Sequence, residues 1–263
     1  MISRTLQHSA LMVAPACLGA FVAGAGHAAD AAASEHPGLV GSAGIGPAIV
    51  PKYVGSRSSS VWPIPILSLT YNDTYYIELA RVGVHLLSNA EKTMAFGLAV
   101  EPRFGHTQGD GPRVLGMHNR RPTLEGGPSF NWETRIVDVN LAYFHDLTGA
   151  NHGTSVRATL SKDVLTEGKL KLSVNTGIDR VSSRTVDYYF GVAASEATAT
   201  RPAYAGRSGV DLSYGFTGSY ELTAKNSIVF GANLTRLNHS AAASPIVERR
   251  NVRLGWIGYA WNF

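Results

Sequence analysis

Apolar and polar residues alternate along much of the chain, most clearly over residues 210–222, VDLSYGFTGSYEL. Its even positions are Val, Leu, Tyr, Phe, Gly, Tyr and Leu, whereas the odd positions are mostly polar. Successive side chains of a β-strand point to opposite faces, so this pattern predicts a strand with one apolar and one polar face. The same rhythm marks residues 94–103, 135–146, 154–164 and 170–178.

Weaker alternation marks four further segments, 39–50, 61–71, 74–87 and 226–237. With a final strand at 252–263, the pattern predicts ten strands. Runs of roughly ten residues or more are longer than the ~5–6 residues typical of soluble strands and match a tilted span of lipid. The predicted fold is therefore all-β: an antiparallel transmembrane β-barrel with lipid outside and a polar lumen inside.

The connectors test this prediction, because bacterial barrels have short periplasmic turns and long outer loops. Tight turns at 72–73 and 224–225 fit, but residues 104–132 form a long segment on the expected inner side. Either this segment hides an extra hairpin, which makes twelve strands, or it is a periplasmic or lumen-filling segment. Pro63 and Pro65 fit poorly inside a strand, since a closed barrel has no edge, and we expect them at the outer rim.

The last strand ends in four large apolar residues at alternate positions, Ile257, Tyr259, Trp261 and Phe263. They share one face of the strand and are expected to face lipid. C-terminal strands of this form resemble the signal by which the outer-membrane insertion machinery recognises barrel substrates.

The first 28 residues predict a cleaved signal peptide. Arg4 gives a positive start, a run of small and apolar residues follows, and Gly26-His27-Ala28 offers a cleavage site. The alternative, a membrane anchor, is disfavoured because the apolar run is short. The single cysteine, Cys17, lies within this run, so the mature chain 29–263 has no disulfide or thiol chemistry available.

Composition narrows the function classes. Charged residues make up 16% of the chain, below the roughly 25% of soluble domains. The formal net charge is only +4 and no basic cluster or recognisable module is present, which argues against nucleic acid binding. The mature chain lacks an uninterrupted apolar stretch of ~18 residues, so a transmembrane helix is not expected.

Charged residues of both signs fall on the inward rows of the predicted strands. They are Arg103, Asp138, Arg157, Asp163, Lys171, Asp211 and Glu221. One interpretation is a pore with weak ion selectivity. The other, which we favour, is that side chains nearly fill the lumen and the charges satisfy one another.

Catalysis would need a nucleophile, a base and an orienting group within reach of one another. His145 and Asp146 are neighbours on a strand and face opposite sides, so they cannot form a dyad. His152 and Ser155 could approach His145 across a turn, but no third member is fixed. A lipid-modifying enzyme is therefore the least favoured alternative, and we predict no catalysis, no cofactor and no metal site.

Four segments carry a family resemblance. They are GIGPAIVPKYVGSRSSSVWPIPIL (44–67), GLAVEPRFG (97–105), YYFGVAASEATATRPAYAGRSGVDLSYGFTGSYELT (188–223), and SPIV (244–247) before a last strand that closes on Phe263. Together they cover most of the mature chain, which resembles the MipA/OmpV family. The resemblance implies a barrel in the outer membrane of a Gram-negative envelope, in contact with lipid and lipopolysaccharide.

The resemblance also implies partners. In some relatives the barrel is a scaffold joining a lytic transglycosylase to a peptidoglycan synthase, and in others it is implicated in adhesion or envelope stress. We therefore expect a scaffold protein, with a narrow solute channel or a surface adhesin as alternatives. Our own hypothesis is that the segment 104–132 supplies the periplasmic contact surface, with Arg113, Arg120 and Arg121 as anchors.

Overall fold

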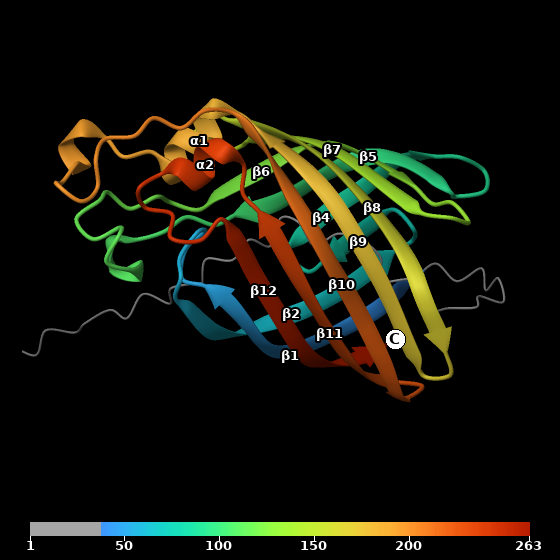
Figure 1. Cartoon of the computed structure of the whole chain (residues 1–263). Helices are drawn as coiled ribbons and strands as arrows, with labels where there is room; N and C mark the ends of the chain where they lie inside the picture. Colours follow the sequence, from blue (N-terminus) through green and yellow to red (C-terminus); the bar gives the residue numbers. More distant parts are fainter. Residues whose placement is uncertain (1–37) are drawn as a thin grey trace, which may run out of the picture.

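In the computed structural model, which describes residues 38–263, the alternating segments form one closed antiparallel barrel of twelve strands. Each strand pairs with its neighbours in sequence, and β12 closes the barrel against β1 (Figure 1). The expected signal peptide, residues 1–28, lies outside the described residues. The strands are β1 Leu39–Pro51, β2 Ser59–Tyr71, β3 Tyr75–Glu78, β4 Arg81–Ser88, β5 Met94–Arg103, β6 Thr123–Trp132, β7 Asp138–Asp146, β8 Thr154–Glu167, β9 Leu170–Val181, β10 Gly209–Thr223, β11 Asn226–Arg236 and β12 Asn251–Asn262.

Apolar side chains cover the outer face of the barrel. Ile45, Leu98, Val156 and Ile257 are all more than two-fifths exposed, and each alternates with buried or half-buried neighbours. A soluble protein would not expose apolar side chains around its whole circumference, so this face is built to contact hydrocarbon. Within residues 38–263, no helix is both long enough and apolar enough to cross a membrane.

The two strands beyond the expected ten arise in two places. Residues 74–87 are not one strand but a short hairpin of β3 and β4, reversed at Leu79, whose φ of 52° is in the left-handed region. The second addition is β6, within the segment 104–132. Gly126 and Gly127 hid this strand from the alternation, and its pairing with β7 skips from Gly126 to Ser129.

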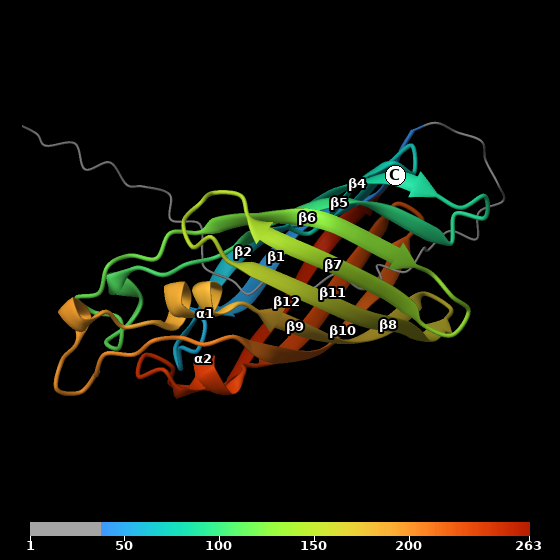
Figure 2. The ribbon, with the colours of Figure 1, turned by 90° about the horizontal axis from the view of Figure 1, so that it is seen from above.

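These additions restore the parity of the connectors. The long loops all lie at the end of the barrel opposite Phe263, together with the helices α1 (Ser183–Phe190) and α2 (His239–Ala243) (Figures 1 and 2). The loop 104–122 is one of them, so its expected position on the periplasmic side is wrong. The long loops are 52–58, 104–122, 147–153, 182–208 and 237–250.

The expectation that Pro63 and Pro65 lie at the rim is also wrong, because both lie well inside β2. The strand tolerates them because its residues 59–66 pair with β1 alone, since β3 reaches only residues Ser68–Tyr71 of β2. A proline on an unpaired edge removes no hydrogen bond from the ladder.

The interior of the barrel has two chemically different sides. The walls of β1, β2 and β12 turn apolar side chains inward, and these form one cluster that includes Ile66, Leu254 and Trp256. The walls of β4 to β9 instead turn charged and polar side chains inward, among them Arg81 and Arg157. The charged side positions the candidate site.

Candidate functional site

Three arginines and three carboxylates of the charged side form one connected network inside the barrel. Glu101 lies between two guanidinium groups, accepting from Arg157 at 2.5 Å and from Arg81 at 2.8 Å. All three side chains are at least 96% buried. Both guanidinium groups also lie over the ring of Phe144, 5.3 and 5.5 Å from its centroid.

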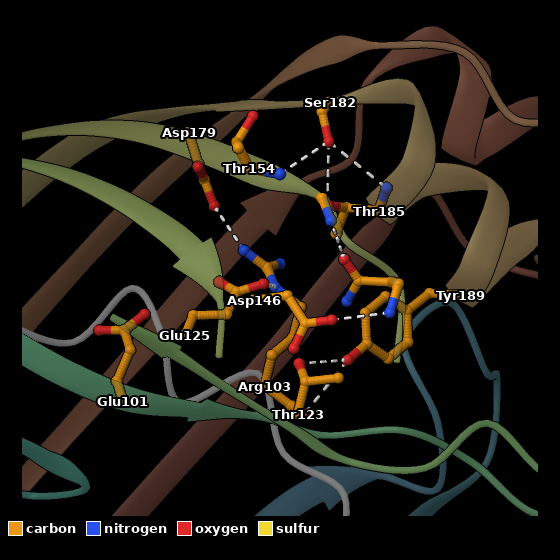
Figure 3. Close-up of polar contacts among 12 residues, drawn as sticks. Glu101, Arg103, Thr123, Glu125, Asp146, Thr154, Asp179, Ser182, Thr185 and Tyr189 are labelled. Carbon is orange, nitrogen blue, oxygen red and sulfur yellow. Dashed lines mark hydrogen bonds and ion pairs between the residues drawn. The ribbon is translucent and has the colours of Figure 1, made fainter. Parts of the chain in front are cut away.

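The network continues toward the long loops through Arg103. This arginine donates to Glu125 at 2.6 Å and to Asp179 at 3.3 Å (Figure 3). Asp179 also accepts from Arg157 at 3.2 Å. The chain thus joins charges from β4, β5, β6, β8 and β9 across the lumen. With three charges of each sign, the network neutralises itself and leaves no excess charge to select ions.

Helix α1 closes the barrel above this network. Its N-cap Ser182 accepts hydrogen bonds from the backbone N–H groups of Thr154 and Thr185, which fixes the helix to the start of β8. At the other end of the helix, the Tyr189 hydroxyl lies 2.8 Å from Thr123 Oγ1 and donates to the Arg103 carbonyl (Figure 3). Burial raises the pKa of the Tyr189 phenol.

Glu196 joins the loop 182–208 to the loop 104–122. Its carboxylate accepts from Arg120 at 2.8 Å, from the backbone N–H of His118 at 2.8 Å and from that of Ala193 at 3.1 Å. Burial would raise the pKa of Glu196, but these hydrogen bonds outweigh it and lower the pKa to about 2. Arg201 completes the joint by donating to the carbonyls of Arg113, Leu115 and Glu196.

The long loops also share a small apolar core, so we call the assembly of 52–58, 104–122, 182–208 and 237–250 the cap. Val114, Met117, Val192 and Ile246 are buried there against Tyr53, whose hydroxyl donates to the Ile246 carbonyl. Burial raises the pKa of that phenol. The ring of His106 lies 5.8 Å from that of Tyr53, and burial, together with the charge of Arg120, lowers the pKa of His106 to about 4.

A cavity of about 90 Å³ lies between the network and the cap. Arg103, Arg157 and Asp179 line its charged side, and Val186 and Phe190 of α1 line its apolar side. A cavity of this volume has room for a few water molecules.

The predicted lumen residues divide into two groups. Arg103 and Arg157 belong to the network, and Asp211 lies just above it, accepting from Asn238 of the cap. The others lie nearer the short turns: Lys171 pairs with Glu221 at 3.7 Å, Asp163 accepts from Ser173, and Asp138 accepts from the Thr134 N–H.

The other predicted site residues lie at both ends of the barrel. Arg120 is engaged with Glu196 in the cap, whereas Arg113 and Arg121 are exposed there. None of the three lies at the end with the C-terminus. At that end, Ile257, Trp261 and Phe263 are about half exposed and Tyr259 is half-buried; their role in insertion stays a prediction.

His145 and Asp146 do not cooperate, as expected for neighbours on one strand. His145 is exposed on the outer face, whereas Asp146 is buried and accepts from the backbone N–H groups of Thr148, Asn151 and His152. Asp146 therefore shapes the turn after β7.

The sequence pattern did not predict several members of the network. Arg81 belongs to a hairpin where the pattern predicts one strand, and Glu125 belongs to a strand that the alternation does not show. Asp179 lies one residue beyond an expected strand. Each would have been found had the strand boundaries been right. Glu196 and Arg201 lie in a loop and carry no local signal.

A closed antiparallel barrel with an apolar exterior and charged side chains in its interior defines the class: a transmembrane β-barrel of the outer-membrane type. A sequence model of the family described as "MltA-interacting protein MipA" matches residues 43–263. The chain belongs to this family and is a protein of the outer membrane.

Curated relatives agree with this assignment. The chain is 32% identical over 152 residues to outer membrane protein Omp26La of Vibrio anguillarum and to outer membrane protein OmpV of Vibrio cholerae. Each match covers 57% of this chain and 58% of the relative's length. Among solved structures, a "bacterial polysaccharide outer membrane secretin" aligns with 88% of this chain and all of its own at 8% identity, with a TM-score of 0.42, from which nothing is inferred.

Replacing Glu101 with Ala should strongly destabilise the barrel, because it leaves Arg81 and Arg157 buried without their shared acceptor. Breaking such a buried pair typically costs about 3–5 kcal/mol. The measurement is urea unfolding in detergent or lipid, followed by the heat-modifiable mobility of the folded barrel. The matched control is Glu221→Ala, which breaks a part-exposed pair and should cost at most about 1 kcal/mol. Equal losses in the two variants would contradict the network's importance.

Acid should loosen the cap in two stages. His106 and Glu196 both have a depressed pKa in the folded cap. The stability that each of them adds is therefore present above its ordinary pKa and is lost as the pH falls. Protonation of His106 should lower the stability of the cap between about pH 6.5 and 4, and protonation of Glu196 should lower it between about pH 4.5 and 2. Hydrogen exchange of residues 104–122, corrected for the intrinsic pH dependence, measures both stages. Glu196→Gln should abolish the second stage and retain the first, displaced to lower pH because the Glu196 charge no longer raises the pKa of His106; an unchanged profile would refute the assignment.

Proposed function

We propose that this outer-membrane barrel is a non-conducting interaction protein without catalysis of its own, and that it serves as a scaffold for periplasmic peptidoglycan-remodelling enzymes. The observation that supports a non-conducting barrel is that the lumen is obstructed at two levels. A neutral ion network crosses the barrel, and a packed cap lies over its mouth. A solute would have to break both.

The structure of the cap argues against a simple channel. Outer loops that gate a pore need to move, but these loops share an apolar core and are tied together by buried Glu196 and Arg201. The ion network is equally fixed, because each carboxylate within it accepts from at least one guanidinium group. A barrel closed in this way presents surfaces rather than a path.

The scaffold part of the proposal draws on the family description, which names an interaction with MltA, and on the end of the barrel that holds the C-terminus. Short turns face the periplasm in barrels of this class. The turns of this end carry exposed charges of both signs, and we call them the turn rim. Its members are Asp73, Glu91, Lys92, Glu133, Arg135, Glu167, Lys169 and Lys225.

The turn rim suits a protein partner better than the cap arginines do. Its charges are solvent-exposed, and the one ion pair recorded among them, Lys92 with Asp73, is itself mostly exposed. Such groups steer association and set specificity at little cost in desolvation. A lytic transglycosylase and a peptidoglycan synthase, both acting in the periplasm, could reach this rim but not the cap.

Charge reversal at the rim tests the proposal. Arg135→Glu, Lys169→Glu and Lys225→Glu together should greatly reduce pull-down of the lytic transglycosylase of the same organism, because complementary charges become like charges. The matched control is Arg113→Glu with Arg121→Glu, which reverses exposed arginines of the cap and should leave pull-down unchanged.

Both variants must show the heat-modifiable mobility of a folded barrel. Retained capture by the rim variant would contradict the proposed contact. Loss of capture only in the cap variant would also contradict it, because the contact would then involve the opposite end of the barrel.

A further inference from the structure

The second strand of the barrel is paired on one side only. Along β1, the pairing of β2 is unbroken from Tyr71 to Ser59. On its other edge, β3 covers only Ser68–Tyr71, and the last backbone hydrogen bond runs from Leu79 N–H to the Leu67 carbonyl, at 2.7 Å. Within residues 38–263, no strand pairs with this edge between Ser59 and Ile66.

The two prolines of β2 lie at this open edge. In an antiparallel strand, alternate residues direct their backbone groups to the same side. Leu67 directs its carbonyl toward β3, so Pro65 and Pro63, two and four residues before it, direct their backbone to the same side. The register agrees, because Pro63 lies opposite Pro47, where neither residue could donate across the pair.

This placement removes two backbone donors from the open edge. An unsatisfied backbone N–H in hydrocarbon costs several kcal/mol. At Pro63 and Pro65 that group does not exist, so the edge presents fewer unpaired polar groups to an apolar medium than two other residues would, although the carbonyls remain. The sequence therefore keeps this edge open rather than leaving it ready for a further strand.

The gap in strand pairing beside β2, which we call the interruption, has a second border on β5. The pairing of β4 with β5 begins at Val82 and Val100, so Glu101–Arg103 of β5 pair only with β6. The tip of the β3–β4 hairpin, at Leu79, lies at the lower limit of the interruption. The contact of Tyr53 with His106 joins the loops that follow β1 and β5 above it.

Apolar side chains lie directly behind the open edge. Trp62, Ile64 and Ile66 alternate with the prolines and turn inward, where they join the cluster that contains Trp256 and Leu254. Trp62 and Ile64 remain half-buried although they face the interior. On the outside, Val61 is 65% exposed and both prolines are exposed. Apolar side chains thus lie on both faces of the edge, and Leu79 and Phe104 from the borders of the interruption pack against the same cluster.

We propose that this edge is a lateral opening in the barrel wall, and that a hydrocarbon chain of a membrane lipid lies in it against Trp62, Ile64 and Trp256. The chemistry of the edge selects this occupant. A strand from a partner or a second copy would find no donor at Pro63 or Pro65. The side chains that β2 turns inward along this edge are apolar, and the charged groups at the β5 border, Glu101 and Arg103, are already engaged in the ion network.

Quenching of tryptophan fluorescence by lipids with brominated acyl chains tests the proposal. The chain has four tryptophans, Trp62, Trp132, Trp256 and Trp261. Single-tryptophan variants, with the other three replaced by Phe, are reconstituted into vesicles of phosphatidylcholine, plain or brominated at mid-chain. The Trp261 variant is the positive control, because this side chain is exposed on the outer face. The negative control is Phe144→Trp in a chain with all four tryptophans replaced, because Phe144 is fully buried behind paired strands.

The proposal predicts that Trp62 and Trp256 lose fluorescence to an extent comparable with Trp261, and far more than Phe144→Trp. The proposal would be overturned if neither tryptophan is quenched more than the negative control. Such a result would mean that lipid does not enter the edge, because side chains or a second copy of the chain seal it. Folding is checked by heat-modifiable mobility.

If a variant fails to fold, Ile64→Cys in the otherwise cysteine-free mature chain provides a second test. It should react with a membrane-partitioning maleimide and not with a charged, water-soluble one, whereas the control Ala142→Cys, a buried position of β7, should react with neither. Equal reactivity of the two cysteines would overturn the proposal.

Discussion

Backbone hydrogen bonding in a medium without water is the constraint on which the rest of this structure depends. Every N–H and C=O group of a strand that crosses hydrocarbon needs a partner strand, so the sheet must close, and β12 pairs with β1. Closure then divides the side chains into an outer apolar row and an inner row. The interruption beside β2 is partly accommodated in the same terms, because two prolines occupy β2 where partner strands are missing and remove two N–H groups.

The inner row creates the second problem that the chain must solve. Charges drawn into a narrow lumen are stable only when each has its partner, and Glu101, Arg103, Arg157 and Asp179 meet this condition by bridging one another. The cap solves the same problem for the loops, where Glu196 collects the donors of several segments. Both arrangements cross-link parts of the barrel and its cap, and they support the proposal that the protein serves contact with partners rather than passage of solutes.

Alternation in the sequence was sufficient to predict the class of fold and most strands, because a strand between lipid and lumen must alternate. Alternation did not predict the elements whose position depends on backbone conformation rather than on side-chain polarity. The reversal at Leu79 carries none of the usual turn residues, and β6 contains Gly126 and Gly127, which leave no pattern to detect. The joint between Arg120 and Glu196 spans 76 residues, so no local pattern could show it. The inward position of Arg103 and Arg157 was predictable; their partners were not.

Single-channel conductance in a planar bilayer tests the central claim that the lumen is closed. The sample is the refolded mature chain, with heat-modifiable mobility as proof of the folded barrel. The account predicts no steady ion current at any applied voltage at which the bilayer is stable. A steady current that changes when Arg157 or Asp211 is replaced would contradict it, because ions would then be passing the network that is held to seal the barrel.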